Sequence, residues 1–80
     1  MSSLFGLKIG YNPVMQFSDR LRELRNINNL SQMQLSQATG ISQSAIAKWE
    51  LNKTEPTASA LIVLAKFFDE SVDYLLRLAE

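Results

Sequence analysis

The amino-acid sequence predicts a compact all-α domain of five helices. From Phe17 onwards, apolar residues recur at the three- and four-residue spacing of amphipathic helices. Ser, Thr, Asn, Gly and Pro residues interrupt this pattern at short intervals, as expected for helices joined by short loops. The chain has 80 residues, of which 46% are hydrophobic, so it allows one domain with a modest core.

The first predicted helix starts at Asn12-Pro13, where Asn acts as the cap and Pro fits the first helical position. Its apolar residues recur at helical spacing: Phe17, Leu21, Leu24 and Ile27. Its charged residues are expected on the opposite face: Asp19, Arg20, Arg22 and Glu23. Asn28-Asn29 ends the helix.

Residues 30–50 contain two short helical patterns that meet at Gly40. Ser31 and Gln34 form an S-x-x-Q capping box for the first, and Ser42 caps the second. Gly40 supplies the left-handed residue that ends the first helix. The apolar positions expected to face inward are Leu35, Ala38, Ile41, Ala45, Ile46 and Trp49. A helix, a short turn with Gly and a second helix are the parts of a helix-turn-helix.

The fourth predicted helix runs from Ala58 to Phe68, between the loop that contains Pro56 and a polar break at Asp69-Glu70. Pro56 prevents continuation of the preceding helix, and Thr57 caps the new one. The expected packing side consists of Leu61, Ile62, Leu64, Ala65 and Phe68. Because this helix is apolar around much of its circumference, we expect it to be the central core helix.

The last predicted helix runs from Val72 to about Leu78, with Ser71 as its cap and Asp73 in its first turn. Its apolar residues exceed what one short terminal helix can bury within its own subunit: Tyr74, Leu75, Leu76 and Leu78. We expect Leu75 to fill the core, with Leu78 and either Tyr74 or Leu76 nearer the surface.

These features resemble the Cro/C1-type helix-turn-helix family, which includes phage repressors and many small bacterial regulators. The resemblance extends from Phe17 to about Leu76. The matching residues are Leu21, Leu24, Arg25, Leu30, Ser31, Gln32, Leu35, Gly40, Ile41, Ser42, Ile46, Trp49, Glu50, Pro56, Leu61, Leu64, Ala65, Val72, Asp73, Leu75 and Leu76. The resemblance implies a lambda-repressor-like fold and a sequence-specific, DNA-binding transcriptional regulator. It also implies a salt bridge between Arg25 and Glu50.

The first turn of the third helix carries the predicted base contacts. A recognition helix presents its N-terminal residues to the major groove of double-stranded DNA, and here these are Ser42, Gln43 and Ser44. A Gln amide can bond adenine N6 and N7 together. Lys48 follows Ser44 by four residues on the same face, where it can reach a guanine edge or a phosphate.

The predicted contacts to the DNA backbone are Ser31, Gln32, Asn52 and Lys53. The resemblance places Gln32 against the backbone, often bonded to the base-reading glutamine of the third helix. Asn52 stands where the family usually has glycine, and it tolerates the left-handed conformation better than most residues. Leu51 stands where the family often has Asn, which removes one usual phosphate contact.

The formal net charge of the chain is zero, but its charges are unevenly distributed. Residues 1–54 contain six Lys or Arg and three Asp or Glu, whereas residues 55–80 contain two and five. The half that contains the helix-turn-helix is therefore basic, with a net charge of +3 against −3 for the remainder. Steering of a charged partner from long range should be weak.

The residue inventory argues against an enzyme. The chain has no Cys and no His, which removes disulfides, thiolate metal sites, the commonest general base and the commonest metal ligand. Its three glycines are scattered, so there is no phosphate-binding loop. We expect no metal, cofactor or small-molecule ligand. Neither a signal peptide nor a membrane span is evident, so we expect a cytoplasmic protein.

Three questions stay open at the level of sequence. The main functional alternative is a protein-interaction module, such as an antitoxin or an adaptor, that uses the same fold. Residues 1–14, which precede the predicted domain of residues 15–80, are either an arm without fixed structure or an arm that pairs with a partner subunit or lies on DNA. We expect a homodimer, formed in solution or on DNA, through the last helix or through this arm.

Overall fold

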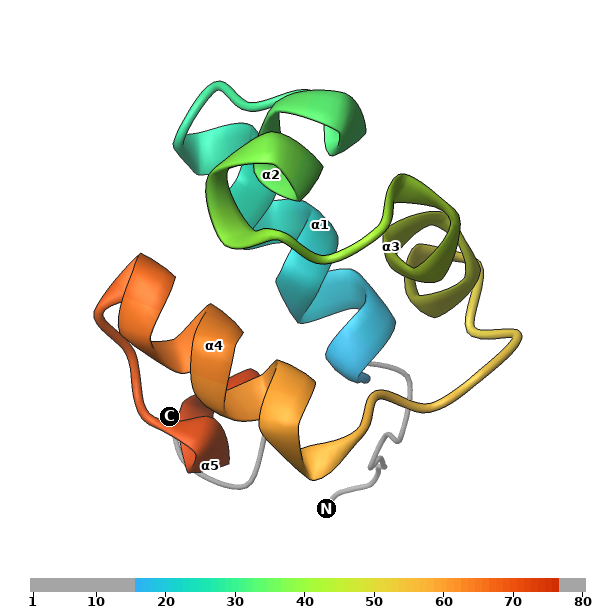
Figure 1. The fold of residues 1–80 in the computed structure, drawn as a ribbon. Helices are drawn as coiled ribbons and strands as arrows, with labels where there is room; N and C mark the ends of the chain where they lie inside the picture. The colour runs from blue at the N-terminus through green and yellow to red at the C-terminus, as the bar shows by residue number, and fades with distance from the viewer. Residues whose placement is uncertain (1–15, 77–80) are drawn as a thin grey trace, which may run out of the picture.

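Five α-helices and their connections make up residues 16–76, the part of the chain that this computed structural model describes (Figure 1). The helices are α1 (Phe17–Ile27), α2 (Gln32–Thr39), α3 (Gln43–Glu50), α4 (Ala58–Phe68) and α5 (Val72–Leu75). The described residues contain no strand, which confirms the predicted all-α class. No helix among them has the length and apolar content needed to cross a bilayer.

Helix α1 begins at Phe17, later than the sequence predicted. Gln16 has an extended backbone, with φ −103° and ψ 178°, so the helix cannot continue through it. The N–H of Gln16 instead donates to Oδ2 of Asp19 at 3.1 Å, which caps the helix start. The predicted start at Asn12-Pro13 lies outside the described residues.

The other four helices begin at the caps that the sequence predicts. The side-chain oxygens of Ser31, Ser42, Thr57 and Ser71 each accept a hydrogen bond from the backbone N–H three residues later. In α2 the capping box is complete, because Ser31 N–H also donates to Oε1 of Gln34 at 2.8 Å. These bonds satisfy N–H groups that a helix start leaves without an intrahelical partner.

Left-handed residues shape the turns, as the sequence predicts for two of them. Gly40 ends α2 with φ 78°, and Asn52 follows α3 with φ 59°. Two further residues adopt the same conformation without having been predicted: Asn29 after α1 and Asp69 after α4, both with φ 57°. Asn and Asp adopt the left-handed conformation at a lower free-energy cost than most other residues with a side chain. This conformation lets the chain reverse its direction within a short loop.

The core takes one fully buried residue from each helix. Leu21, Leu35, Ile46, Leu64 and Leu75 are each 0% exposed. Trp49 of α3 is 6% exposed, and its ring meets Phe17 of α1 edge to face at a centroid distance of 6.2 Å. The expected inward positions of Leu75 and Trp49 are therefore confirmed.

The sequence predicted Arg20 on a charged face opposite the apolar one. This prediction is wrong, because only 3% of the residue is accessible. Its guanidinium carbon lies 3.6 Å from the centre of the Tyr74 ring, and its Nη1 lies 3.2 Å from Oε1 of Glu23. Stacking on an aromatic face lets an arginine remain charged in a position closed to water. The stacked pair joins α1 to α5.

The prediction that the fourth helix would be the central core helix is wrong. Figure 1 shows α1 in the middle of the bundle and α4 at one side. Helix α4 buries Leu64 and Ala65, but Ile62, Val63 and Phe67 are 38–49% exposed. The apolar residues on its outer side therefore do not contribute to this core.

Two further residues expected to face inward are exposed. Ile27, at the end of α1, is 67% exposed, and Ala38 of α2 is also exposed. The last helix ends at Leu75 with Leu76 as its cap, and its predicted extension to Leu78 falls on residues outside the described part. Tyr74 and Leu76 are both half-buried.

Replacement of the buried indole tests this core. Trp49→Ala should lower the free energy of unfolding by about 3–5 kcal/mol, as truncation of a large core side chain does. Phe67→Ala is the matched control, because this aromatic residue is 40% exposed and should cost far less. Urea unfolding followed by circular dichroism measures both. Equal losses for the two variants would contradict the placement of Trp49 in the core.

Candidate nucleic-acid interface

Helix α3 packs by one face and presents the other. Ile46 and Trp49 are buried, whereas the predicted base contacts are all exposed: Ser42, Gln43, Ser44 and Lys48. Ser42 Oγ accepts the N–H of Ala45 at 3.1 Å, which leaves its hydroxyl hydrogen free to donate. The exposed first turn thus offers one amide and two hydroxyls.

The predicted backbone contacts flank this exposed face in sequence. Ser31 caps α2, and Asn52 and Lys53 lie in the turn after α3; all three are exposed. Gln32, the first residue of α2, is half-buried. The resemblance implies a bond from its side chain to Gln43, but in the structure this side chain donates to Glu50 instead.

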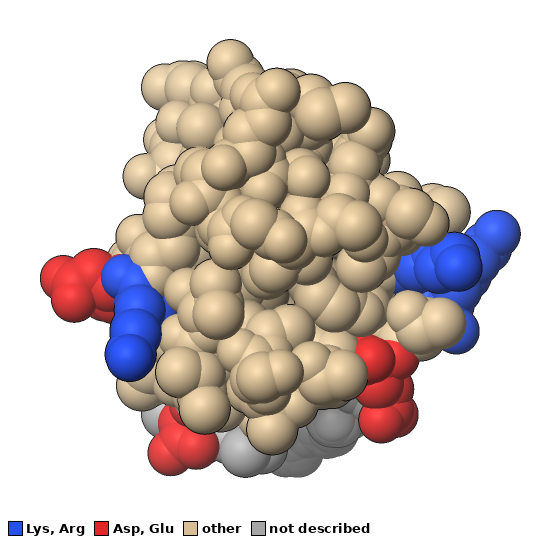
Figure 2. Space-filling model, viewed as in Figure 1, with Lys and Arg blue, Asp and Glu red and all other residues tan. Residues whose placement is uncertain are grey.

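Charge is absent from most of the helix-turn-helix unit. Residues 26–47, which include the whole of α2, contain no Asp, Glu, Lys or Arg. In Figure 2 the upper part of the molecule, where α2 lies, shows no charged side chain, and basic side chains project on the side of α3. The cations of α3 and its following turn are Lys48 and Lys53, and neither takes part in an ion pair within the described part of the chain.

The arginines of α1 are engaged within the protein instead. Arg22 Nη2 lies 2.9 Å from Oδ1 of Asp19, and Arg25 Nε lies 2.7 Å from Oε2 of Glu50. The side chain of Arg25 is 14% exposed and that of Glu50 only 4%. The hydrogen bond to Glu50 is the main reason that the pKa of Arg25 is raised above its usual value.

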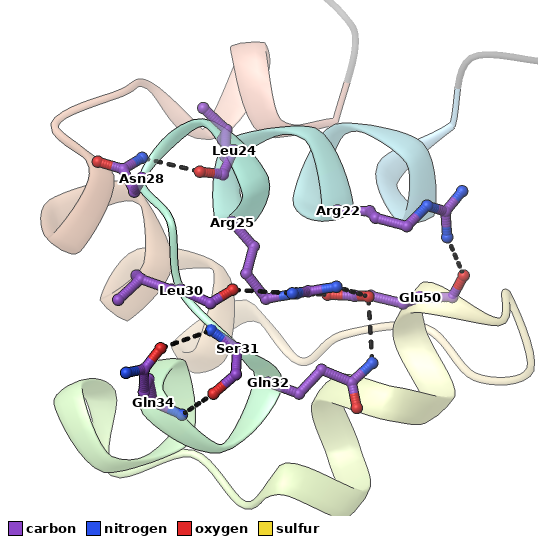
Figure 3. Close-up of polar contacts among 9 residues, drawn as sticks. All are labelled: Arg22, Leu24, Arg25, Asn28, Leu30, Ser31, Gln32, Gln34 and Glu50. Carbon is purple, nitrogen blue, oxygen red and sulfur yellow. Dashed lines mark hydrogen bonds and ion pairs between the residues drawn. The ribbon is translucent and has the colours of Figure 1, made fainter.

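Glu50 is the meeting point of three helices (Figure 3). Its Oε1 accepts bonds from Arg25 Nη2 at 2.9 Å and from Gln32 Nε2 at 3.1 Å, in addition to the Arg25 Nε bond to Oε2. Its backbone carbonyl accepts a bond from Arg22 Nη1 at 2.8 Å. We call this set of residues, Arg22, Arg25, Gln32 and Glu50, the Glu50 junction.

Sequence reasoning missed two members of the Glu50 junction. The sequence pattern places Arg22 on the charged face opposite the apolar one, although it precedes Arg25 by one helical turn and therefore shares a side of α1 with it. That spacing was the available signal. The resemblance places Gln32 against the DNA backbone, and nothing in the local sequence indicates a bond to a residue 18 positions away.

Comparison with protein families places the chain by its sequence. A family model described as Helix-turn-helix matches residues 21–75. The chain is 40% identical over 62 residues to the HTH-type transcriptional activator BcrR of Enterococcus faecalis, a match that covers 78% of this chain and 30% of that protein. It is 42% identical over 59 residues to the control protein C.SmaI of Serratia marcescens, covering 74% of this chain and 70% of that one.

A solved structure with the same fold is that of the P22 c2 repressor protein in complex with a synthetic operator. The two chains superpose with a TM-score of 0.72 at 35% sequence identity, over 78% of this chain and 94% of the other. The chain spans less than a third of the length of BcrR, so the resemblance to that protein concerns one part of it. By sequence and by fold, this chain belongs to the helix-turn-helix family, in agreement with the Cro/C1-type resemblance of its motif.

Proposed function

We propose that this protein is a sequence-specific DNA-binding transcriptional regulator that inserts α3 into the major groove of an operator. The observation that carries the proposal is the division of α3 into a buried apolar face and an exposed first turn of hydrogen-bonding residues. Likeness to a repressor bound to its operator supports it. Occupation of the operator blocks or recruits polymerase, with no chemical step.

In the proposed complex Gln43, Ser44 and Lys48 contact the bases, with Ser42 at the edge of the same surface. Amide and hydroxyl groups match the donors and acceptors that base pairs expose in the major groove. Backbone contacts fall to Ser31, Gln32, Asn52 and Lys53, since free N–H groups at the start of α2 and a cation after α3 both suit phosphate.

The alternative is a protein-interaction module that uses the same fold. Two observations favour it: the zero net charge of the chain and Leu51, which is 65% exposed directly after α3. Selection of bound sequences from a random DNA pool separates the two functions. The regulator should enrich one motif, whereas an adaptor or antitoxin that binds only protein should enrich none.

Readout by Gln43 can be tested by truncation. Gln43→Ala should weaken specific binding by about 1–3 kcal/mol and relax the preference at one base pair, because a bidentate amide contact is lost. Gln37→Ala, at an exposed position of α2, is the matched control. Affinities for the selected site and its single-base variants, measured by fluorescence anisotropy, provide the comparison. An equal loss on specific and random DNA would exclude a base contact.

The dependence of binding on salt should be shallow. With Lys48 and Lys53 as the cations near α3, each subunit neutralises few phosphates, so the slope of log K against log salt should be about −2 to −6 for a dimer. Anisotropy titrations across a range of salt concentrations measure this slope. A slope near zero would remove DNA as the partner.

The proposed assembly is a homodimer on an inverted repeat. One recognition helix reads few base pairs, and a second subunit one helical turn away, about 34–36 Å along the duplex, is the usual remedy. In the last helix Leu75 is fully buried, as expected, and Tyr74 lies against Arg20, which leaves Leu76 and Leu78 as the candidates for a patch there. Leu78 and residues 1–14 remain the two expected interfaces.

Light scattering with and without the selected site should therefore give two subunits per site. Leu78→Lys should weaken the pair if the last helix forms the interface, because a two-fold contact places the introduced charge opposite its own copy. Deletion of residues 1–14 is the parallel variant, and loss of the dimer in that variant alone would move the interface to the arm. One subunit on a site without two-fold symmetry would contradict the proposal.

A further inference from the structure

The C-terminal end of α3 is completely satisfied in hydrogen bonding. The carbonyls of Ala47, Lys48 and Trp49 accept backbone N–H groups from the turn that follows. The carbonyl of Glu50, the last residue of the helix, accepts Arg22 Nη1 at 2.8 Å. The last carbonyls of a helix have no intrahelical partner, and for Glu50 a side chain of α1 supplies one, so this end of α3 is held to α1.

Helices α2 and α3 are joined at both of their ends. The turn at Gly40 connects the end of α2 to the start of α3. At the opposite ends, Gln32, the first residue of α2, donates to Glu50, the last residue of α3, at 3.1 Å. Among the described residues, this is the single side-chain hydrogen bond between the two helices. This bond therefore restrains the angle between α2 and α3 at the ends opposite the turn.

The orientation of the Gln32 amide is determined by its partner. Glu50 Oε1 already accepts Arg25 Nη2 and can only accept again, so the Gln32 nitrogen, not its oxygen, must face it. In Figure 3 the Gln32 side chain reaches from α2 to the end of α3, and its oxygen points away from Glu50. Because the Glu50 side chain is 4% exposed, water does not compete freely for this bond.

We propose that Gln32 is a positioning residue that determines specificity, because it fixes the angle of α3 on α2 through Glu50 before any DNA is bound. The inference rests on the proposed function and adds to it. Helix α3 is about 12 Å long, so a rotation of about 5° about its Glu50 end displaces its first turn, which carries Gln43 and Ser44, by about 1 Å. A hydrogen bond to a base edge tolerates less than that, whereas non-specific contact with phosphates tolerates more.

The test compares Gln32→Met with the matched control Gln37→Met. Methionine keeps the length and helix preference of glutamine but cannot donate to Glu50. Gln37 lies in the same helix and is exposed, and the side-chain hydrogen bonds found among residues 16–76 do not involve it. For each variant, affinities for the selected site and for a random duplex of equal length are measured at one salt concentration. Amide resonances of α3 in the free protein and the thermal midpoint are recorded alongside.

The proposal predicts that Gln32→Met lowers the ratio of specific to random affinity about five- to thirtyfold, which corresponds to about 1–2 kcal/mol. It also predicts shifted α3 amide resonances in the absence of DNA, with Gln37→Met unchanged in both respects.

Equal losses on the two duplexes with unmoved α3 resonances would reduce Gln32 to a phosphate contact. A lower thermal midpoint with an unchanged affinity ratio would reduce it to a structural role, and either result overturns the inference. If the wild-type protein selects no site, the proposed function fails, but the α3 resonances still decide whether Gln32 positions the helix.

Discussion

A buried carboxylate that must be neutralised dominates this structure. The side chain of Glu50 is 4% exposed, and an isolated charge in such a position would cost several kcal/mol. Two bonds from Arg25 and one from Gln32 satisfy it, while Arg22 takes the carbonyl of the same residue. Because these donors come from α1 and α2 and the acceptors from α3, removal of the charge penalty requires all three helices to be in place. The Glu50 junction thus links the stability of the domain to the position of the helix that is proposed to read DNA.

The distribution of charge follows from the same arrangement. The three arginines of α1 are held by Glu23, Asp19 and Glu50 within the protein, which leaves Lys48 and Lys53 as the cations near α3. Because residues 26–47 contain no charge, the proposed binding to DNA would depend on amides, hydroxyls and helix-start N–H groups more than on Coulombic attraction. In the proposed complex such a surface would favour selectivity over tight non-specific binding, and the proposed second subunit on the same site would supply the remaining affinity.

Local signals in the sequence predicted most of the fold. Caps at Ser31, Ser42, Thr57 and Ser71, and the left-handed residues Gly40 and Asn52, depend on a few neighbouring residues, so their chemistry is readable from the chain. Errors arose where distant packing overrides the local pattern. Arg20 is buried because Tyr74 of α5 covers it, and Ile62 is exposed because the side of α4 that meets the core is the one with Leu61, Leu64, Ala65 and Phe68. For the candidate site, exposure of the first turn of α3 followed from periodicity, whereas the bond from Gln32 to Glu50 depends on a helix-crossing geometry that spacing does not encode.

The most direct test of the central role of Glu50 is a double-mutant cycle with Arg25. Urea unfolding of Arg25→Met, Glu50→Met and the double variant, in a buffer that contains a stabilising osmolyte, gives the three free-energy changes. Each single variant should lose about 3–5 kcal/mol, because it leaves a buried charge without its partner. The double variant should lose clearly less than the sum, since neither charge then remains. Additive losses would contradict the account, because they would mean that the two side chains stabilise the helices independently.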